Sequence, residues 1–290
     1  MSGRCRRNAR LALVGTAIAF GLMAVLSRKL SRGPGGFTAG QLSVIRFAIG
    51  ALISLVAFRI RPGLYRPHNR KLLMLRGLSG GVVVILYFFA LSRIPAAPAG
   101  MIFNLYPVFA TVFAVFALGE RPTIHLLFGL LLATAGVWLM LGQGGMPAGM
   151  GVGELAAFAS AIFAAISANI IRGMRGTDNA PTIFFWFCLA GLPVVAPFAL
   201  DRWPTDPAAW ALAGCMGLAA FVAQLLMTEA YGTLNVSESA VWLQLAPIAL
   251  LLMAVPLLGE RVSAVSMIGV LLGVVGVAYG TALGSRRAPP

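Results

Sequence analysis

The sequence predicts an all-α integral membrane protein with ten transmembrane helices, arranged as two inverted five-helix repeats. Of the 290 residues, 59% are hydrophobic and only 10% are charged, whereas soluble domains carry roughly 25% charged residues. So few charges do not cover the surface of a soluble protein of this size, and a disordered chain needs more charge and less apolar surface. Ten apolar runs and an internal repeat are the other two observations that predict this fold.

The ten apolar runs are the predicted transmembrane helices. A bilayer core about 30 Å thick requires roughly 20 apolar residues per helix. The runs cover residues 11–30, 39–58, 72–92, 97–118, 123–141, 152–172, 181–200, 208–231, 238–258 and 263–283. Glycine, proline and charged residues separate them. The basic start at 4–10 followed by an apolar stretch resembles a secretory signal, but no small-residue cleavage site follows, so we expect it to be retained as the first span.

The basic residues predict the orientation of the spans. The chain has 22 Lys and Arg against 8 Asp and Glu, grouped in short clusters between the apolar runs. No zinc-finger spacing or aromatic-interleaved basic face accompanies them, which argues against nucleic-acid binding. With the N-terminus in the cytoplasm, 15 Lys and Arg fall inside and 6 outside, counting Arg76 as a loop residue. This bias predicts cytoplasmic termini in a bacterial inner membrane.

A shift of 140 residues aligns the two halves of the chain. Asn104 then meets Gln244, Pro107 meets Pro247, and the Leu-Gly-Glu-Arg sequence at 118–121 meets its copy at 258–261. We therefore predict repeats at 11–141 and 152–283. Each holds five spans, an odd number, so the second must be inverted relative to the first. Inverted repeats are typical of secondary transporters, although a duplication kept for structural reasons is the alternative.

Several motifs of the two halves resemble the EamA-type repeat of the drug/metabolite transporter superfamily. They are the Leu-Gly-Glu-Arg sequences, Gly129 with 135–137, Arg46-Phe47, the segment 86–91, and the glycines from Gly269 to Gly276. The resemblance covers about 11–283. It implies a ten-helix carrier without ATP hydrolysis that moves small metabolites, often outward. It also implies that the first, third and fourth helices of each half line a central cavity, while the fifth and tenth lie at the periphery.

Two prolines mark the predicted site. Pro107 and Pro247 lie within the fourth and ninth spans at corresponding positions. Proline removes a backbone hydrogen bond and kinks a helix, so carbonyls near Phe103 and Leu243 need other partners. Matched breaks in two halves are a pointer to a transporter site, although membrane helices tolerate proline elsewhere too.

Polar and aromatic side chains near these prolines are the candidate substrate-binding residues. Asn104 and Thr111 share a helix face, and Gln224, Thr228 and Tyr231 form a polar stripe. The full set is Tyr87, Asn104, Thr111, Gln224, Thr228, Trp242 and Gln244. Hydrogen bonding between helices is the alternative role for each of them.

Charged residues supply candidates for coupling and gating. Arg46 lies within the second span and Glu229 near the inner end of the eighth. Ionisable groups in a bilayer are costly and are functional candidates. Snorkelling for Arg46 and a solvated helix end for Glu229 are the alternatives. We expect the pairs Glu120-Arg121 and Glu260-Arg261 to fix loop geometry or to latch two gates alternately.

The sequence favours a secondary carrier over an enzyme or a channel. The two histidines, His68 and His125, lie at a loop and a helix start, and no metal-ligand set, catalytic cluster or Walker A motif is present. We expect no cofactor and no metal. Few midplane charges favour an amphipathic or zwitterionic solute such as an amino acid or amine. Import of a nucleoside-like or carboxylate compound is the alternative. Two GxxxG patterns at 269–280 suit tight helix packing or a homodimer contact.

Overall fold

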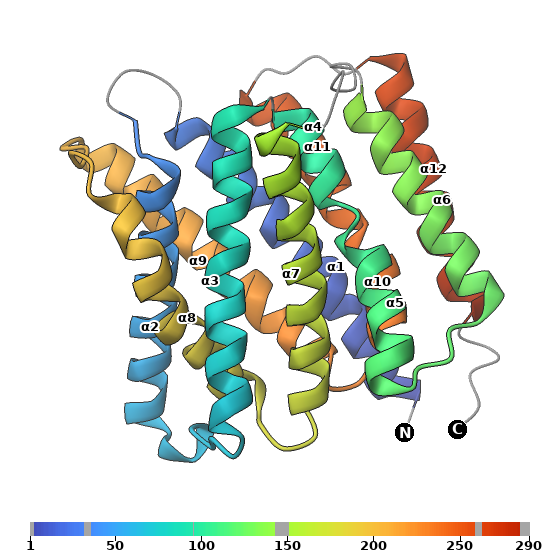
Figure 1. Ribbon diagram of the computed structural model, residues 1–290, viewed down its shortest axis with the longest axis horizontal. Helices are drawn as coiled ribbons and strands as arrows, with labels where there is room; N and C mark the ends of the chain where they lie inside the picture. Colours follow the sequence, from blue (N-terminus) through green and yellow to red (C-terminus); the bar gives the residue numbers. More distant parts are fainter. Residues whose placement is uncertain (1–2, 32–35, 95, 143–150, 259–262, 285–290) are drawn as a thin grey trace.

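The chain is an all-helical membrane protein throughout its described part (Figure 1). The computed structural model describes residues 3–31, 36–94, 96–142, 151–258 and 263–284. The helices are α1 (Gly3–Leu30), α2 (Ala39–Ile60), η1 (Pro62–Leu64), α3 (Arg70–Arg93), α4 (Ala96–Phe103), α5 (Tyr106–Leu118), α6 (Ile124–Leu141), α7 (Val152–Met174), α8 (Ala180–Val195), η3 (Ala196–Ala199), α9 (Pro207–Ala230), α10 (Val236–Leu243), α11 (Leu245–Leu258) and α12 (Ala264–Gly284).

The predicted apolar runs are confirmed as helices. Among the described residues, eight helical segments are long and apolar enough to cross a bilayer, and Tyr106–Leu118 and Ile124–Met140 are shorter apolar helices. Two of the predicted spans are interrupted. The fourth is divided into α4 and α5, and the ninth into α10 and α11.

Local sequence sets the helix ends. Thr38 begins α2 in a capping box with Gln41, and the Asn179 side chain accepts a hydrogen bond from the N–H group of Thr182 in the first turn of α8. Such caps satisfy backbone donors that a helix leaves open. Gly119 ends α5 with a φ of 65°, a left-handed conformation that favours glycine. This turn sets the position of Glu120, which follows it directly.

The helices α6 and α12 form a pair at one edge of the bundle (Figure 1), as the family resemblance implies for the fifth and tenth helices. Their glycines lie in this contact. A Cβ atom at Gly269 would lie 2.6 Å from the Gly136 carbonyl oxygen, and one at Gly276 would lie 2.5 Å from the Ala133 nitrogen. The GxxxG patterns therefore pack α12 against α6 of the same chain. A homodimer contact is not needed to explain these glycines, and it stays a prediction.

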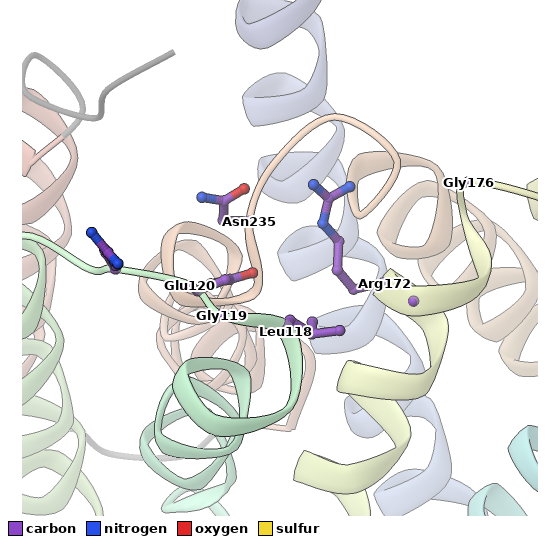
Figure 2. Close-up of a pocket in the computed structure, with 8 residues that line it drawn as sticks. Leu118, Gly119, Glu120, Arg172, Gly176 and Asn235 are labelled. Carbon is purple, nitrogen blue, oxygen red and sulfur yellow. The ribbon is translucent and has the colours of Figure 1, made fainter.

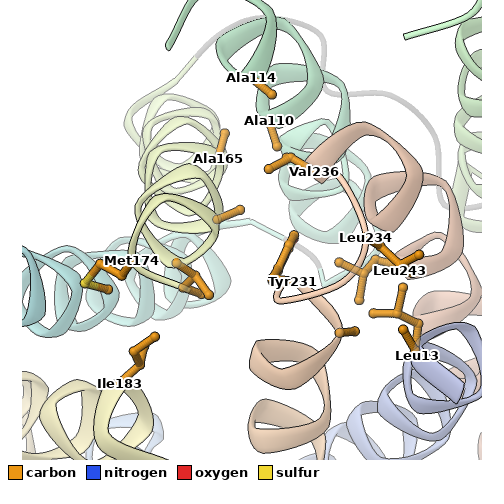
Figure 3. Close-up of a cluster of buried hydrophobic side chains, with 14 of the residues drawn as sticks. Leu13, Ala110, Ala114, Ala165, Met174, Ile183, Tyr231, Leu234, Val236 and Leu243 are labelled. Atoms are coloured by element: carbon orange, nitrogen blue, oxygen red, sulfur yellow. The ribbon is translucent and has the colours of Figure 1, made fainter. Parts of the chain in front are cut away.

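The centre of the molecule joins both halves of the chain. One buried cluster contains Leu13 of α1, Ala110 of α5, Ala165 of α7, Tyr231 after α9 and Leu243 of α10. Figure 3 shows these side chains gathered at the junction of the helices. Leu243 directly precedes the break between α10 and α11, and Ala110 lies in the second turn after the break before α5, so this core packs against both broken helices.

Several helix ends meet at one end of the bundle, which we call the terminal face. There α1 begins, α5 and α7 end, α10 begins, and α12 ends (Figure 1). The two ends of the described chain thus lie at the same end of the bundle.

Candidate functional site

The two broken helices meet at their interruptions. Asn104 lies between α4 and α5, Gln244 lies between α10 and α11, and both are buried. The Asn104 Nδ2 group donates to Gln244 Oε1 over 2.5 Å, and Gln244 Nε2 donates to the Thr134 hydroxyl of α6 over 2.6 Å. The structure therefore brings together two predicted site residues that are 140 positions apart.

The prolines lie just after the breaks. Pro107 is in the first turn of α5, where a missing N–H group costs no intrahelical hydrogen bond, and Pro247 is the third residue of α11. The interruptions lie directly after Phe103 and Leu243, the last residues of α4 and α10. Each of the two spans ends there and restarts as a new helix, α5 or α11. The Thr111 hydroxyl donates a 3.0 Å hydrogen bond to the backbone carbonyl of Pro107.

Aromatic rings line the first break. The rings of Tyr87 in α3 and Phe103 in α4 have centroids 4.7 Å apart, and Phe103 lies 5.3 Å from Tyr106 in α5. Trp242, just before the second break, packs against the central cluster. Its indole Nε1 is buried, with no hydrogen-bond partner among the described residues. The two candidate aromatic residues thus lie on the two broken helices or beside them.

The polar stripe of α9 faces the protein interior. Gln224 and Thr228 are buried, and the Thr228 hydroxyl donates to the Gln224 carbonyl over 2.7 Å. The Gln224 Nε2 group is buried without a partner in the described part of the chain. The neighbouring Glu229 differs. Its side chain is 63% exposed and accepts a 3.1 Å hydrogen bond from Arg175, so it is placed at a solvated helix end.

Arginines lie inside the helical bundle at two places. Arg46 of α2 is partly buried, with its guanidinium 5.5 Å from the centre of the Phe47 ring. Arg76 lies in the second turn of α3 and is only 4% exposed. Its assignment to a cytoplasmic loop is therefore wrong. Helix α3 begins at Arg70, and the Arg76 face packs against α7 and α8.

The Arg76 guanidinium has two contacts with neighbouring side chains, but not all of its N–H groups have a partner among the described residues. Its Nη1 group donates to the Ser167 hydroxyl of α7 over 2.9 Å, and its Cζ lies 4.1 Å from the centre of the Phe187 ring in α8. Ser79 supports Ser167 through a 3.0 Å contact between the two hydroxyls. The Nε group is buried and has no partner among the described residues. The sequence analysis did not identify Arg76 as a site residue. The signal for it was its position within the apolar run 72–92, where a basic residue is unusual.

Glu120 connects the two halves of the chain at the terminal face. Its carboxylate accepts hydrogen bonds from the backbone N–H groups of Val236 and Ser237, over 2.7 and 3.1 Å, and from the Ser237 hydroxyl over 2.7 Å. These donors form the N-terminus of α10, where the helix dipole favours an anion. The end of α5 is thereby tied to the start of α10.

Beside this contact lies an open cavity of about 540 Å³. Figure 2 shows Glu120, Asn235 and Arg172 around it, contributed by the ends of α5, α10 and α7. Its lining residues are Leu118, Gly119, Glu120, Arg121, Arg172, Gly173, Gly176 and Asn235. Two predicted latch residues, Glu120 and Arg121, thus border a hollow at the terminal face. Glu260 and Arg261 lie outside the described residues.

A second acidic residue of α10 was missed by the sequence analysis. Glu238 is 5% exposed and accepts hydrogen bonds from Arg6 over 2.6 Å and from Arg10 over 2.9 and 2.7 Å. It ties α10 to the start of α1. The signal was an acidic residue in the first turn of a span with two arginines at the N-terminus, but their pairing spans more than 220 positions.

Two comparisons with known proteins agree on the family. The model of the EamA-like transporter family matches twice, at residues 8–142 and 151–280. The pseudopaline exporter CntI of Pseudomonas aeruginosa is 26% identical over 195 residues, which covers 67% of this chain and 68% of that protein. The "Probable terminal-alkyne amino-acid exporter" of Streptantibioticus cattleyicolor is 26% identical over 262 residues, covering 83% and 84%.

A solved structure shares the fold. The crystal structure of a protein that is 25% identical to this chain superposes on it with a TM-score of 0.82, covering 98% of this chain and 100% of its own. The overall arrangement of the helices is therefore one that a whole experimental chain also adopts.

Proposed function

Because this chain belongs to the EamA-like transporter family of the drug/metabolite transporter superfamily, we propose that it is a secondary carrier that exports a small organic metabolite by alternating access. The protein is a multi-pass membrane transporter of a small metabolite and not an enzyme. Its energy source, direction and cargo are the proposed parts.

Two inverted five-helix halves, at 11–141 and 152–283, form the transport unit of this proposal. The double match of one family model supports two related halves. The corresponding breaks at Asn104 and Gln244 support a site at their interface. Interrupted helices near the midplane expose backbone groups only where protein, water or substrate satisfies them.

The hydrogen bond between Asn104 and Gln244 is the observation that carries the proposal. Each of these side chains is the hydrogen-bond partner of the other at the point where both helices are broken. In our proposal the cargo replaces this bond and binds among the residues around the breaks. These are Tyr87, Asn104, Thr111, Gln224, Thr228, Trp242 and Gln244.

The terminal face is proposed to be the cytoplasmic side of a bacterial inner membrane. With Arg76 removed from the loops, 14 Lys and Arg remain on the predicted inner side against 6 outside, which still satisfies the positive-inside rule. Glu120 then closes the cytoplasmic gate, and Glu260 is its proposed counterpart on the opposite side. Arg121 and Arg261 flank the two latches.

Export of an amino acid or amine is the preferred direction and cargo. Two relatives carry the word exporter in their names, and one of these names specifies an amino acid. Uptake of a carboxylate or nucleoside-like compound is the second candidate. Coupling to protons through Glu229 is testable because Glu229→Gln would abolish the pH dependence of flux. A variant with unchanged pH dependence removes Glu229 from the coupling.

The test is a flux assay with purified protein in proteoliposomes, using a mixed pool of amino acids, amines and phosphorylated sugars. We expect amino acids or amines to move and Asn104→Ala to reduce their flux at least tenfold. Ser54→Ala is the matched control, because Ser54 is buried but bonds only within its own helix. Movement of phosphorylated sugars alone would overturn the proposed cargo, and equal effects of the two variants would overturn the site.

A further inference from the structure

We propose that Arg76 binds a carboxylate group of the transported compound. The cargo is then a carboxylic acid, such as an amino acid or a related organic acid, and not a simple amine. This inference rests on the transporter function proposed above and names the chemistry of its site.

Arg76 is a buried cation whose hydrogen-bonding capacity is mostly unused. A guanidinium has five N–H donors in a fixed fork. Within the described chain, Arg76 uses one of them, on Ser167, and its Nε is buried without a partner. The Phe187 ring lies against the guanidinium, with its centre 4.1 Å from Cζ. A carboxylate matches the open fork of such a group in a bidentate arrangement.

No acidic side chain of the described residues neutralises Arg76. Asp201 is exposed, and the other carboxylates have partners of their own. Glu120 caps α10, Glu154 caps α7, Asp206 caps α9, Glu229 meets Arg175, and Glu238 meets Arg6 and Arg10. Asp178 accepts bonds from the His68 and Asn69 backbones. Since buried charges in proteins are normally paired, the missing anion is a ligand in our interpretation.

Arg46 strengthens the demand for an anion. Its guanidinium lies 5.5 Å from the Phe47 ring, and this ring packs 4.9 Å from Phe187, the ring that Arg76 contacts. Among the described residues, Arg46 has no hydrogen bond or ion pair. Two like charges near each other in a bilayer-embedded bundle destabilise one another. A negatively charged cargo offsets this repulsion, so binding and charge compensation occur together.

The remaining unpartnered groups are mainly donors. In the described part of the chain, buried atoms without a partner include Trp186 Nε1, Gln224 Nε2 and Trp242 Nε1, besides Arg76 Nε. Trp186 precedes Phe187 in α8, and both tryptophans pack against the central cluster that contains Tyr231. An interior rich in free donors fits a cargo rich in acceptor oxygens.

Depth and burial favour cargo over lipid. Arg76 is six residues into α3, about 9 Å at 1.5 Å per residue, and lies between α7 and α8 at 4% exposure. A headgroup phosphate outside the bundle does not reach such a group.

The experiment compares compounds that differ only in the carboxylate. Purified full-length protein is tested with L-phenylalanine, phenylalaninamide and phenylethylamine, both for flux in proteoliposomes and for the ligand-induced rise in Tm. We expect the acid to move and to stabilise the protein. Arg76→Gln raises the half-saturating concentration of the acid at least about 30-fold, which corresponds to about 2 kcal/mol. Arg76→Lys has an intermediate effect because it keeps the charge and loses the fork.

Arg93→Gln is the matched control, since Arg93 is an exposed arginine at the end of the same helix. Its values should stay within twofold of the wild type. If Arg76→Gln fails to fold, Ser167→Ala reports on the same site, with a weaker loss of acid binding of about fivefold, corresponding to about 1 kcal/mol.

Three outcomes overturn the inference. One is transport of the amine with no transport or binding of the acid. Another is an equal loss of amine and acid binding in Arg76→Gln, which indicates a purely structural role. The third is stabilisation by phosphatidylglycerol but not by free carboxylates, which assigns the site to lipid. A fourth outcome separates the two proposals. If no compound is transported, but the wild-type protein binds the acid and Arg76→Gln does not, the transport proposal is refuted and the carboxylate site is supported.

Discussion

The Glu120 carboxylate accepts hydrogen bonds from both the backbone N–H and the hydroxyl of Ser237, a residue 117 positions away. It also accepts the N–H of Val236. A loop acid of the first half therefore provides the N-terminal cap of a helix in the second half. Because α10 begins at this cap, any motion that separates α5 from α10 must leave its first N–H groups without this partner.

Glu120→Gln is expected to loosen the terminal face. The neutral amide has one acceptor oxygen in place of two and loses the charge–dipole attraction, a change of about 1–2 kcal/mol. A cysteine introduced as Ser239→Cys, at a position that is fully buried in α10, should then react with a maleimide about 5 to 30 times faster. The measurement requires a background in which Cys5, Cys188 and Cys215 have been replaced.

Asp206→Asn is the control for this prediction. Asp206 also caps a helix, α9, with its carboxylate, but its bonds are local to its own loop. Unchanged labelling in Asp206→Asn and faster labelling in Glu120→Gln are expected. Equal rates in both variants would show that the Glu120 cap does not control access.

The bond between Asn104 and Gln244 should show measurable energetic coupling. Hydrogen bonds between membrane helices average about 0.6 kcal/mol and reach about 1.7 kcal/mol in double-mutant cycles. We expect a coupling in this range for Asn104→Leu and Gln244→Leu, measured by unfolding of the purified protein in mixed micelles. Gln244→Leu should cost more by itself, since Gln244 also bonds Thr134. Strictly additive losses would mean that the two breaks are energetically independent.

The sequence predicts the helices of this protein well because the bilayer imposes length and hydropathy on each of them. Pro107 and Pro247 also indicate where two spans are interrupted, since proline cannot take part in a continuous ladder. The paired breaks are visible in the sequence for the same reason. The direct bond between Asn104 and Gln244 is not, because hydropathy does not record which side chains meet.

The charged residues are harder to predict from the sequence. Arg76 follows a cluster of basic residues, so the sequence suggests a loop position. Only the structure shows that its side of α3 is buried against Ser167. Glu238 reads as the start of a span, whereas its partners Arg6 and Arg10 come from the other end of the chain. A GxxxG pattern likewise fits contacts within a chain and between chains, and only the structure shows that Gly276 packs on Ala133.

Two glycine substitutions should change the stability of the protein in opposite directions. Gly276→Ala places a methyl group 2.5 Å from the Ala133 nitrogen of the packed partner helix, and overpacking of this kind costs about 1–3 kcal/mol. Gly214→Ala meets nothing within 4 Å and should stabilise α9 by about 0.5–1 kcal/mol through helix propensity. Thermal unfolding in detergent checks both. A stable Gly276→Ala variant would contradict the close α6–α12 contact.

The two arginines on Glu238 should be partly redundant. Arg6 and Arg10 each bond a different oxygen of a carboxylate whose side chain is 6% exposed. Removing either arginine leaves the other, so Arg6→Gln and Arg10→Gln should each cost less than about 1 kcal/mol, as expected for pairs with a partly exposed partner.

The double variant leaves the carboxylate buried with no cation, and should cost about 2–3 kcal/mol, more than the sum of the single losses. Adding Glu238→Gln to the double variant should recover part of the stability, since no buried charge remains. The free energy of unfolding of the four proteins tests this. Small, additive losses would show that both arginines act only as surface charges and that α10 is held to α1 by apolar packing alone.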